Sequence, residues 1–179
     1  MREHLLEEQG YICCYCMSRI DASYMKIEHF KARSLFREKQ LNYANLFGAC
    51  CGKKIDKNQF YNCDKGKKNL DYIDLLSNIE RSIKYKKDGT ILSDNSDIDK
   101  ELNKILNLNH EDLKNNREDA LNQLTCELKK RKNGFETSNL KRIIRQYQNK
   151  NSKGKYRPYC EMIVYFLTKK LKSKGIVLK

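Results

Sequence analysis

The chain has 179 residues, of which 39% are hydrophobic and 34% are charged, which suits one domain of ordinary size with a modest core. No apolar run approaches the length of a membrane helix, and the amphipathic start "MREHLLEEQG" lacks the apolar core of a signal peptide, so we expect a cytoplasmic protein with no membrane segment. Disulfides are rare in a reducing compartment, so clustered cysteines there indicate a metal site.

The net charge of +14 is concentrated toward the end of the chain. Residues 125–179 contain 16 Lys or Arg and 3 Asp or Glu, whereas residues 1–74 contain 13 and 10. A basic segment of this kind is typical of proteins that bind a polyanion such as DNA or RNA. A solvated helix face is the alternative, and we favour the polyanion because the whole imbalance falls in one segment.

The first half of the chain is predicted to hold few regular elements. Residues 2–9 should form a short helix that stops at Gly10. Irregular, cysteine-rich sequence follows to about residue 70, with a strand expected at "MKIEHF" (25–30), where apolar residues alternate. A hairpin is predicted over 83–93, with Asp88 and Gly89 in its turn.

From Ile98 onward the pattern is helical. Apolar residues recur at helical spacing up to Leu106, and "NLNHEDLKNNREDALNQLTCELKKRK" continues the pattern. A last helix is expected around "YCEMIVYFLTKKL", just after Pro158. The chain should therefore divide into a cysteine-rich module, residues 1–74, and a basic, mostly helical extension, residues 75–179.

Cys13 and Cys16 form a C-x-x-C pair, a tight knuckle that directs both sulfurs toward one ion. Structural zinc takes four tetrahedral ligands, so a second pair must come from elsewhere, and the candidates are Cys50, Cys51 and Cys63. A set of free buried thiols is the alternative.

The remaining cysteines are not expected to bind metal. Cys14 should pack beside the knuckle or stay exposed. Cys126 and Cys160 fall in apolar helical patterns and are predicted to lie in the core.

Polar residues between and beside the metal-binding cysteines could do chemistry. Glu28 and His29 are adjacent in the predicted strand, Asn45 shortly precedes the second cysteine group, and Asp64 directly follows the last of these cysteines. A histidine with a near-neutral pKa can accept a proton, and carboxylate oxygens suit Mg²⁺, whereas thiolates select Zn²⁺. A lone histidine is more often structural, but its carboxylate neighbour and the flanking metal ligands favour a catalytic role.

The order of these motifs resembles the HNH, or ββα-metal, nuclease family. Its zinc-bearing form has a C-x-x-C knuckle, an acid-His strand, an Asn-Leu loop, and then Cys with Asn or Asp and a Lys, here Lys67; the match covers residues 11–69. The stretches "ILNLNHEDLKNNR" and "YRPYCEMIVYFL" are similar to a subfamily that includes the HNH component of the Septu antiphage system. The resemblance implies an α+β fold, a zinc-stabilised ββα-metal HNH module followed by a mostly α-helical extension.

The resemblance also implies roles for individual residues. His29 would be the general base, Asn45 would orient it, and Glu28 and Asp64 would bind a catalytic Mg²⁺ or Mn²⁺. Asp64 stands where many members have Asn or His, and Glu28 is longer than the common Asp. The structural zinc ligands would be Cys13, Cys16, Cys50 and Cys63, and the lysines that could contact phosphates are Lys53, Lys54, Lys65, Lys67 and Lys68.

Three functions fit these features. The first is a metal-dependent endonuclease that cuts DNA, serving as the nuclease subunit of an antiphage complex with an ATPase, as the resemblance implies. The second is a zinc-stabilised module that binds nucleic acid without catalysis, which would leave the Glu-His pair unexplained. The third is a structural adaptor whose amphipathic helices dock on a partner protein, and this is compatible with the first.

Overall fold

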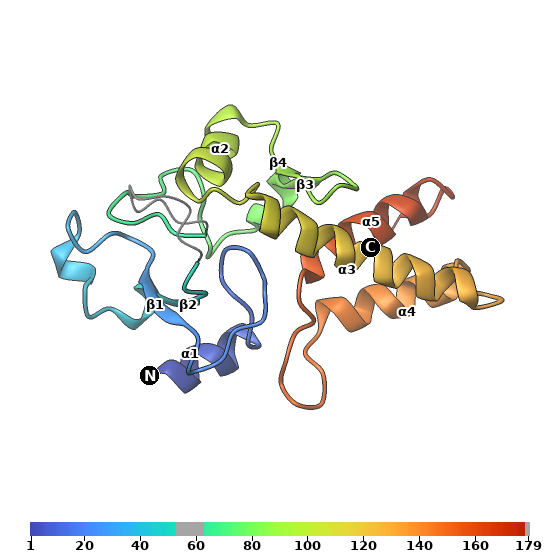
Figure 1. The fold of residues 1–179 in the computed structure, drawn as a ribbon, viewed down its shortest axis with the longest axis horizontal. Coiled ribbons are helices and arrows are strands. Elements are labelled where there is room, and N and C mark those ends of the chain that lie inside the picture. Colours follow the sequence, from blue (N-terminus) through green and yellow to red (C-terminus); the bar gives the residue numbers. More distant parts are fainter. Residues whose placement is uncertain (53–62, 178–179) are drawn as a thin grey trace.

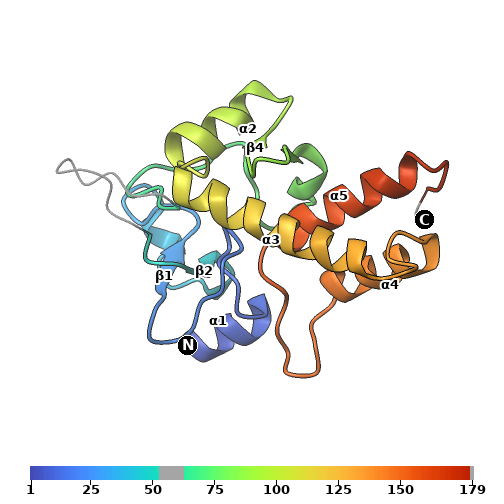
Figure 2. The same ribbon diagram turned by 45° about the vertical axis from the view of Figure 1, so that its right-hand side comes forward.

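The computed structural model describes residues 1–52 and 63–177, and these residues form an α+β fold with five α-helices and two two-stranded antiparallel sheets (Figure 1). Helix α1 (Arg2–Gln9) and the sheet of β1 (Lys26–His29) and β2 (Leu46–Ala49) lie toward one end of the molecule. Helix α4 (Thr137–Gln148) extends toward the other end (Figures 1 and 2). Within the described residues, no helix combines the length and the apolar character that crossing a membrane requires.

Helix α1 (Arg2–Gln9) buries Leu5 and Leu6 and ends at Gly10, as predicted. Gly10 has a φ of 60°, a left-handed conformation that glycine adopts without strain, and its N–H donates to the carbonyl of Glu7 at 3.3 Å. A side chain at Gly10 would also collide with the ring of Tyr156, so the loop before α5 packs directly on the end of α1.

The predicted strand at residues 25–30 is confirmed as β1 (Lys26–His29), which pairs antiparallel with β2 (Leu46–Ala49). In this register Glu28 lies opposite Phe47, and His29 lies opposite Leu46. Short 3-10 helices at Arg37–Lys39 and Tyr43–Asn45 form part of the connection between the strands. The described residues that follow β2, from Cys63 to Asn78, form turns and bends, so any helix completing a ββα unit is not among them.

The hairpin predicted over 83–93 is also confirmed, with β3 (Lys84–Tyr85) paired to β4 (Ile91–Leu92). A 3-10 helix at Ile79–Ser82 precedes it. The turn contains Asp88 and Gly89, and Gly89 has a φ of 77°.

The helical extension contains α2 (Ser96–Lys100), a π-helical continuation (Glu101–Ile105), α3 (Glu111–Lys130), α4 (Thr137–Gln148) and α5 (Cys160–Lys172). The continuous helix predicted from Ile98 to residue 132 is therefore wrong in one place, since the helix is interrupted between residues 106 and 110. Asn107 takes a left-handed φ of 48° there, and the His110 side chain then caps α3 by accepting from the Asp112 N–H at 3.3 Å.

One connected cluster of buried side chains runs through both predicted parts of the chain. It includes Leu6 and Ile20 from the N-terminal end, Leu70 next to the turn region, and Leu106 and Ile163 from the helical extension. Cys160 is buried as predicted, whereas Cys126 is exposed, because α3 turns that position away from its buried Leu121, Leu124 and Leu128. The spacing of apolar residues around residue 126 fits a buried as well as an exposed position, so the sequence alone did not distinguish them.

Candidate metal centre and acidic cluster

The C-x-x-C knuckle is a closed backbone turn. The Met17 N–H donates to the Cys13 carbonyl at 3.0 Å, and the Cys13 N–H donates to the Ser18 carbonyl at 2.9 Å. Met17 takes a left-handed φ of 59°, which lets the chain reverse immediately after Cys16. This turn holds the two thiols on the same side of the loop.

The sulfurs of Cys13, Cys16, Cys50 and Cys63 lie within 4.8 Å of one another. The Cys13 and Cys63 sulfurs are 3.4 Å apart, and those of Cys16 and Cys50 are 3.8 Å apart. A tetrahedral zinc ion with Zn–S bonds of about 2.3 Å requires edges of about 3.8 Å, so four cysteines at this spacing could bind a structural zinc ion. The spacing is far too long for disulfides, whose S–S bond is about 2.05 Å.

Of the two neighbouring cysteines after β2, Cys50 and not Cys51 belongs to the group of four sulfurs. The Cys50 N–H donates to the Cys13 sulfur at 3.3 Å, which brings β2 against the knuckle, whereas Cys51 is exposed. The sequence offered both cysteines as candidates. Which of them joins the other sulfurs depends on the direction in which each side chain points at the end of β2.

The electrostatics of the cluster favour a cation at its centre. Burial raises the pKa of the Cys63 thiol well above its usual value. Burial acts in the same direction on Cys13, but contacts with the neighbouring thiols outweigh it and hold the pKa of Cys13 well below its usual value. A divalent ion at the centre of the cluster would supply the positive charge that four buried thiolates need.

Two backbone hydrogen bonds tie the cysteine cluster to the helical extension. The Cys63 N–H donates to the Leu106 carbonyl at 2.7 Å, and the Tyr159 N–H, at the start of α5, donates to the Met17 carbonyl at 3.1 Å. The cluster thus lies at a junction of chain segments that are distant in the sequence.

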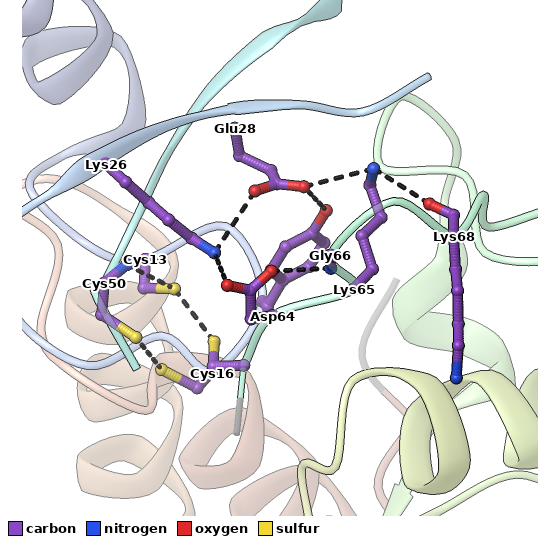
Figure 3. A network of polar contacts seen from close by, with 11 residues as sticks. Cys13, Cys16, Lys26, Glu28, Cys50, Asp64, Lys65, Gly66 and Lys68 are labelled. Atoms are coloured by element: carbon purple, nitrogen blue, oxygen red, sulfur yellow. Dashed lines mark hydrogen bonds and ion pairs between the residues drawn. The ribbon is translucent and has the colours of Figure 1, made fainter. Parts of the chain in front are cut away.

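The carboxylates of Glu28 and Asp64 form an acidic cluster beside the cysteines, and the side chains of Lys26 and Lys65 contact it (Figure 3). The Lys26 ammonium lies between Glu28 and Asp64, 3.5 Å from one carboxylate and 2.6 Å from the other. The Lys65 ammonium lies 3.3 Å from the second oxygen of Glu28, and the Tyr15 hydroxyl donates to the same oxygen at 3.4 Å. Glu28 is 7% exposed, so these contacts compensate for a nearly buried carboxylate.

Both lysines are held in place by the acids. Burial lowers the pKa of Lys26, but its hydrogen bond to Asp64 and its attraction to Glu28 outweigh burial and raise the pKa above its ordinary value. The Lys65 side chain is 1% exposed and also donates to the Lys68 carbonyl at 3.2 Å. Lys65 therefore cannot contact a phosphate from solvent, and that prediction is wrong.

His29 is the last residue of β1, and Asn45 lies on the connection between β1 and β2. The His29 Nε2 donates to the Gln40 carbonyl at 3.1 Å. The Asn45 side chain accepts from the Lys31 N–H at 2.6 Å and donates to the carbonyls of Lys31 and Lys39 at 3.1 and 3.2 Å. Asn45 thus fixes the loop whose next carbonyl, that of Gln40, holds the imidazole.

Among the candidate catalytic residues, Glu28 and Asp64 come together through Lys26. Glu28 and His29 are consecutive in a strand, so their side chains leave opposite faces, and their contacts are accordingly different. In the described part of the chain, the four cysteines are the only group of three or more His, Cys, Asp or Glu side chains close enough to share a metal ion. Lys53 and Lys54 lie outside the described residues.

Lys26 is the member of the acidic cluster that sequence reasoning missed. It precedes Glu28 by two residues, so the alternation of the predicted strand already placed both side chains on one face. That signal was available from the sequence, whereas the approach of Asp64 depends on the cysteine cluster.

The chain was compared with protein-family models and with curated proteins, and neither comparison found a match.

Proposed function

We propose that this chain is a metal-dependent endonuclease of the HNH type that hydrolyses phosphodiester bonds of DNA. The observation that carries the proposal is that two carboxylates contact the same Lys26 ammonium: Glu28, on β1, and Asp64, which directly follows the cluster cysteine Cys63. These are the two acids that the HNH resemblance implies as ligands of the catalytic ion. They are 36 positions apart in the sequence, and the cysteine cluster is what brings their chain segments together.

The contact made by His29 suits a general base. A carbonyl can only accept a hydrogen bond, so the imidazole proton lies on Nε2, toward Gln40. In the neutral ring this leaves Nδ1 with the lone pair that can take a proton from water. Asn45 would assist indirectly, because it anchors the loop that supplies the Gln40 carbonyl.

Glu28 and Asp64 would hold Mg²⁺ or Mn²⁺, the hard cations that carboxylate oxygens prefer. When bound, the ion would stabilise negative charge on the scissile phosphate and on the leaving oxygen. Lys26 lies between the two acids, so its ammonium would have to swing away before the two carboxylates could share an ion.

A non-catalytic, zinc-stabilised nucleic-acid-binding or adaptor module is the second candidate. The observation that favours it is the pair of lysines, Lys26 and Lys65, which neutralise the acids in the absence of any divalent ion. In that case the acidic cluster would be a structural salt-bridge network, and only the cysteines and the basic extension would serve the function.

We further propose that the protein is the nuclease subunit of an antiphage complex with an ATPase. This part of the proposal rests on the Septu-like resemblance of the helical stretches. Copurification of a tagged chain from its native cells should recover an ATPase subunit in a fixed ratio, and recovery of the chain alone would contradict it.

The endonuclease proposal is tested by incubating plasmid DNA with the zinc-loaded protein and Mg²⁺ or Mn²⁺, alone and with the copurified partner. The wild type should nick or linearise the plasmid, and His29→Ala should lose at least about a hundredfold of the rate, the usual contribution of a general base. His4→Ala is the matched control, because His4 is exposed on α1, and it should cut like the wild type. Equal activity of the two histidine variants would mean that His29 is not the general base. No cutting by the wild type under either condition would favour the non-catalytic module.

A further inference from the structure

We propose that a groove along α4 binds the phosphate backbone of a nucleic acid. The groove encloses about 660 Å³ between α4 and the loop at residues 149–157. We call it the α4 groove, and the cations that line it are Lys141, Arg142, Arg145, Lys150 and Arg157. This inference deepens the proposed function and rests on it for the kind of ligand.

The basic stripe follows from the helical repeat. Helix α4 buries Leu140, Ile143 and Ile144 against the core, so positions 138, 142, 145 and 149 turn toward the groove. Arg142 and Arg145 are exposed on that face. The amphipathic pattern that makes α4 a stable helix therefore also presents its cations to solvent along one line.

The charge of the α4 groove is not neutralised by the protein. None of the residues that line it is Asp or Glu. In the described residues, none of the five groove cations forms an ion pair with a carboxylate. The adjoining groove on the α3 side differs, because Asp119 and Glu127 line it together with basic residues. The charged residues that line the α4 groove are thus all basic, whereas those of the adjoining groove, which shares Arg142 and Arg157, are mixed.

Two of the cations are held in place by neighbouring groups. The Arg157 guanidinium lies over the ring of Tyr147, 5.3 Å from its centroid. The Lys150 ammonium donates to the carbonyls of Glu7 and Glu8 at the end of α1, at 2.7 and 3.0 Å. These contacts leave the charges exposed but limit their freedom, which lowers the entropic cost of binding an anion.

The extended arrangement favours a polymer over a small anion. Residues 138 to 149 span about 16 Å along the helix axis. A duplex of that length carries about nine phosphates, at one charge per 1.7 Å. A single phosphate would instead need cations that converge on one point, whereas three of the groove cations lie along α4 and the other two lie on the loop that follows it.

The test is binding of a labelled 30-base-pair DNA duplex, measured by fluorescence anisotropy over a range of salt concentrations with zinc-loaded protein and no Mg²⁺ or Mn²⁺. The groove variant is Arg142→Glu with Arg145→Glu. The matched control, Lys86→Glu with Lys87→Glu, makes the same charge change at exposed positions of the β3–β4 hairpin. Zinc content and circular dichroism confirm that each variant is folded, and Arg142→Gln with Arg145→Gln separates charge loss from charge reversal.

The groove variant should bind at least about tenfold more weakly than the control, and the slope of log affinity against log salt should fall by about two, since about 0.9 is lost per phosphate contact. The glutamine variant should be intermediate. Binding and salt slope equal to those of the control would overturn the inference. Displacement of the DNA by millimolar inorganic phosphate at constant ionic strength would instead identify a small-anion site, and a groove variant that loses an acidic protein partner but keeps DNA would identify a protein interface. Both results overturn it.

These results are separable from the endonuclease proposal. His29→Ala should bind the duplex like the wild type, because His29 lies at the end of β1 and not on α4. A groove that binds DNA in a protein that never cuts supports the inference and contradicts the endonuclease. A protein that cuts, and whose groove variant binds DNA normally, does the reverse.

Discussion

Cys50 and Cys51 are neighbours in the chain but have different surroundings. The sulfur of Cys50 belongs to the cluster, and its N–H donates to Cys13, while Cys51 is exposed. The difference of one position decides which side chain turns toward the knuckle at the end of β2.

Replacing each of these two cysteines therefore gives a paired prediction. Cys50→Ala should reduce bound zinc from one ion per chain to a small fraction and lower the free energy of unfolding by more than about 4 kcal/mol, because a structural zinc site contributes directly to folding. Cys51→Ala should leave the zinc content unchanged and should change the free energy of unfolding by no more than about 0.5 kcal/mol. Elemental analysis and urea unfolding measure both, and equal losses from the two variants would mean that the assigned ligand is wrong.

Lys26 is the second residue whose position has consequences. Its ammonium lies where it attracts both Glu28 and Asp64, and the same negative charges would attract a divalent cation. Lysine and a metal ion should therefore compete for the acidic pair.

Lys26→Met removes the competitor but keeps the length of the side chain. We expect the affinity of the zinc-loaded protein for Mn²⁺ to rise about tenfold, which corresponds to about 1.4 kcal/mol. Lys67→Met is the control, because Lys67 is exposed and makes the same change in net charge. Mn²⁺ titration followed by electron paramagnetic resonance distinguishes them. Unchanged or weaker Mn²⁺ binding by the Lys26 variant would show that the acids form a salt-bridge network and not an ion site.

At the scale of elements, the β3–β4 hairpin is fixed to α3 by its turn. A side chain at Gly89 would overlap the Lys114 carbonyl of α3. The Gly89 carbonyl also accepts from the Arg117 Nε at 2.6 Å, and Arg117, which is 1% exposed, donates further to the Leu108 carbonyl at 2.7 Å. The hairpin, the helix break and α3 are thus joined through one buried guanidinium.

Gly89→Ala should therefore lower the free energy of unfolding by more than the strain of a left-handed backbone alone would. Gly154 has a similar φ of 71°, and a side chain there would meet open space, so Gly154→Ala should cost only about 1 kcal/mol of conformational strain. Gly89→Ala adds the overlap with α3 and should cost at least about 2 kcal/mol more. Urea midpoints of the two variants test this difference, and equal midpoints would mean that the turn can move away from the helix freely.

Elements with a local cause were predictable from the sequence. The stop of α1 at Gly10, strand β1 and the turn at Gly89 each depend on residues within a few positions, and all three are confirmed. The break before α3 was missed because Leu106 and Leu108 keep an apolar pattern while the backbone reverses at Asn107. In the candidate site, the sequence identified the cysteines of the cluster, but the contact of Lys26 with Asp64 depends on tertiary packing.

At the scale of the whole molecule, a buried carboxylate joins the cysteine-rich part to the helical extension. Glu101, which is 4% exposed, accepts from the backbone N–H groups of Asp71 at 2.6 Å and Ile73 at 2.7 Å. The backbone bonds of Cys63 to Leu106 and of Tyr159 to Met17 are two further polar links between these parts, and these three links are the ones nearest the cysteine cluster and the segment at residues 71–73. Loss of the metal should therefore be felt beyond the cysteines, and its effect should decline along the helices.

Hydrogen–deuterium exchange with and without a strong chelator tests this decline. Amides of the knuckle and of β1 and β2 should lose most of their protection, because the cluster closes these segments. The start of α5 near Tyr159 and the segment at residues 102–106 should lose part of theirs, since each bonds directly to a cluster loop. Helix α4 and the far end of α3 pack through apolar contacts such as Ile143 and Leu128, and they should keep their protection. A uniform loss across all helices would mean that the molecule unfolds as one unit, whereas a change confined to the knuckle would mean that the three links carry little coupling.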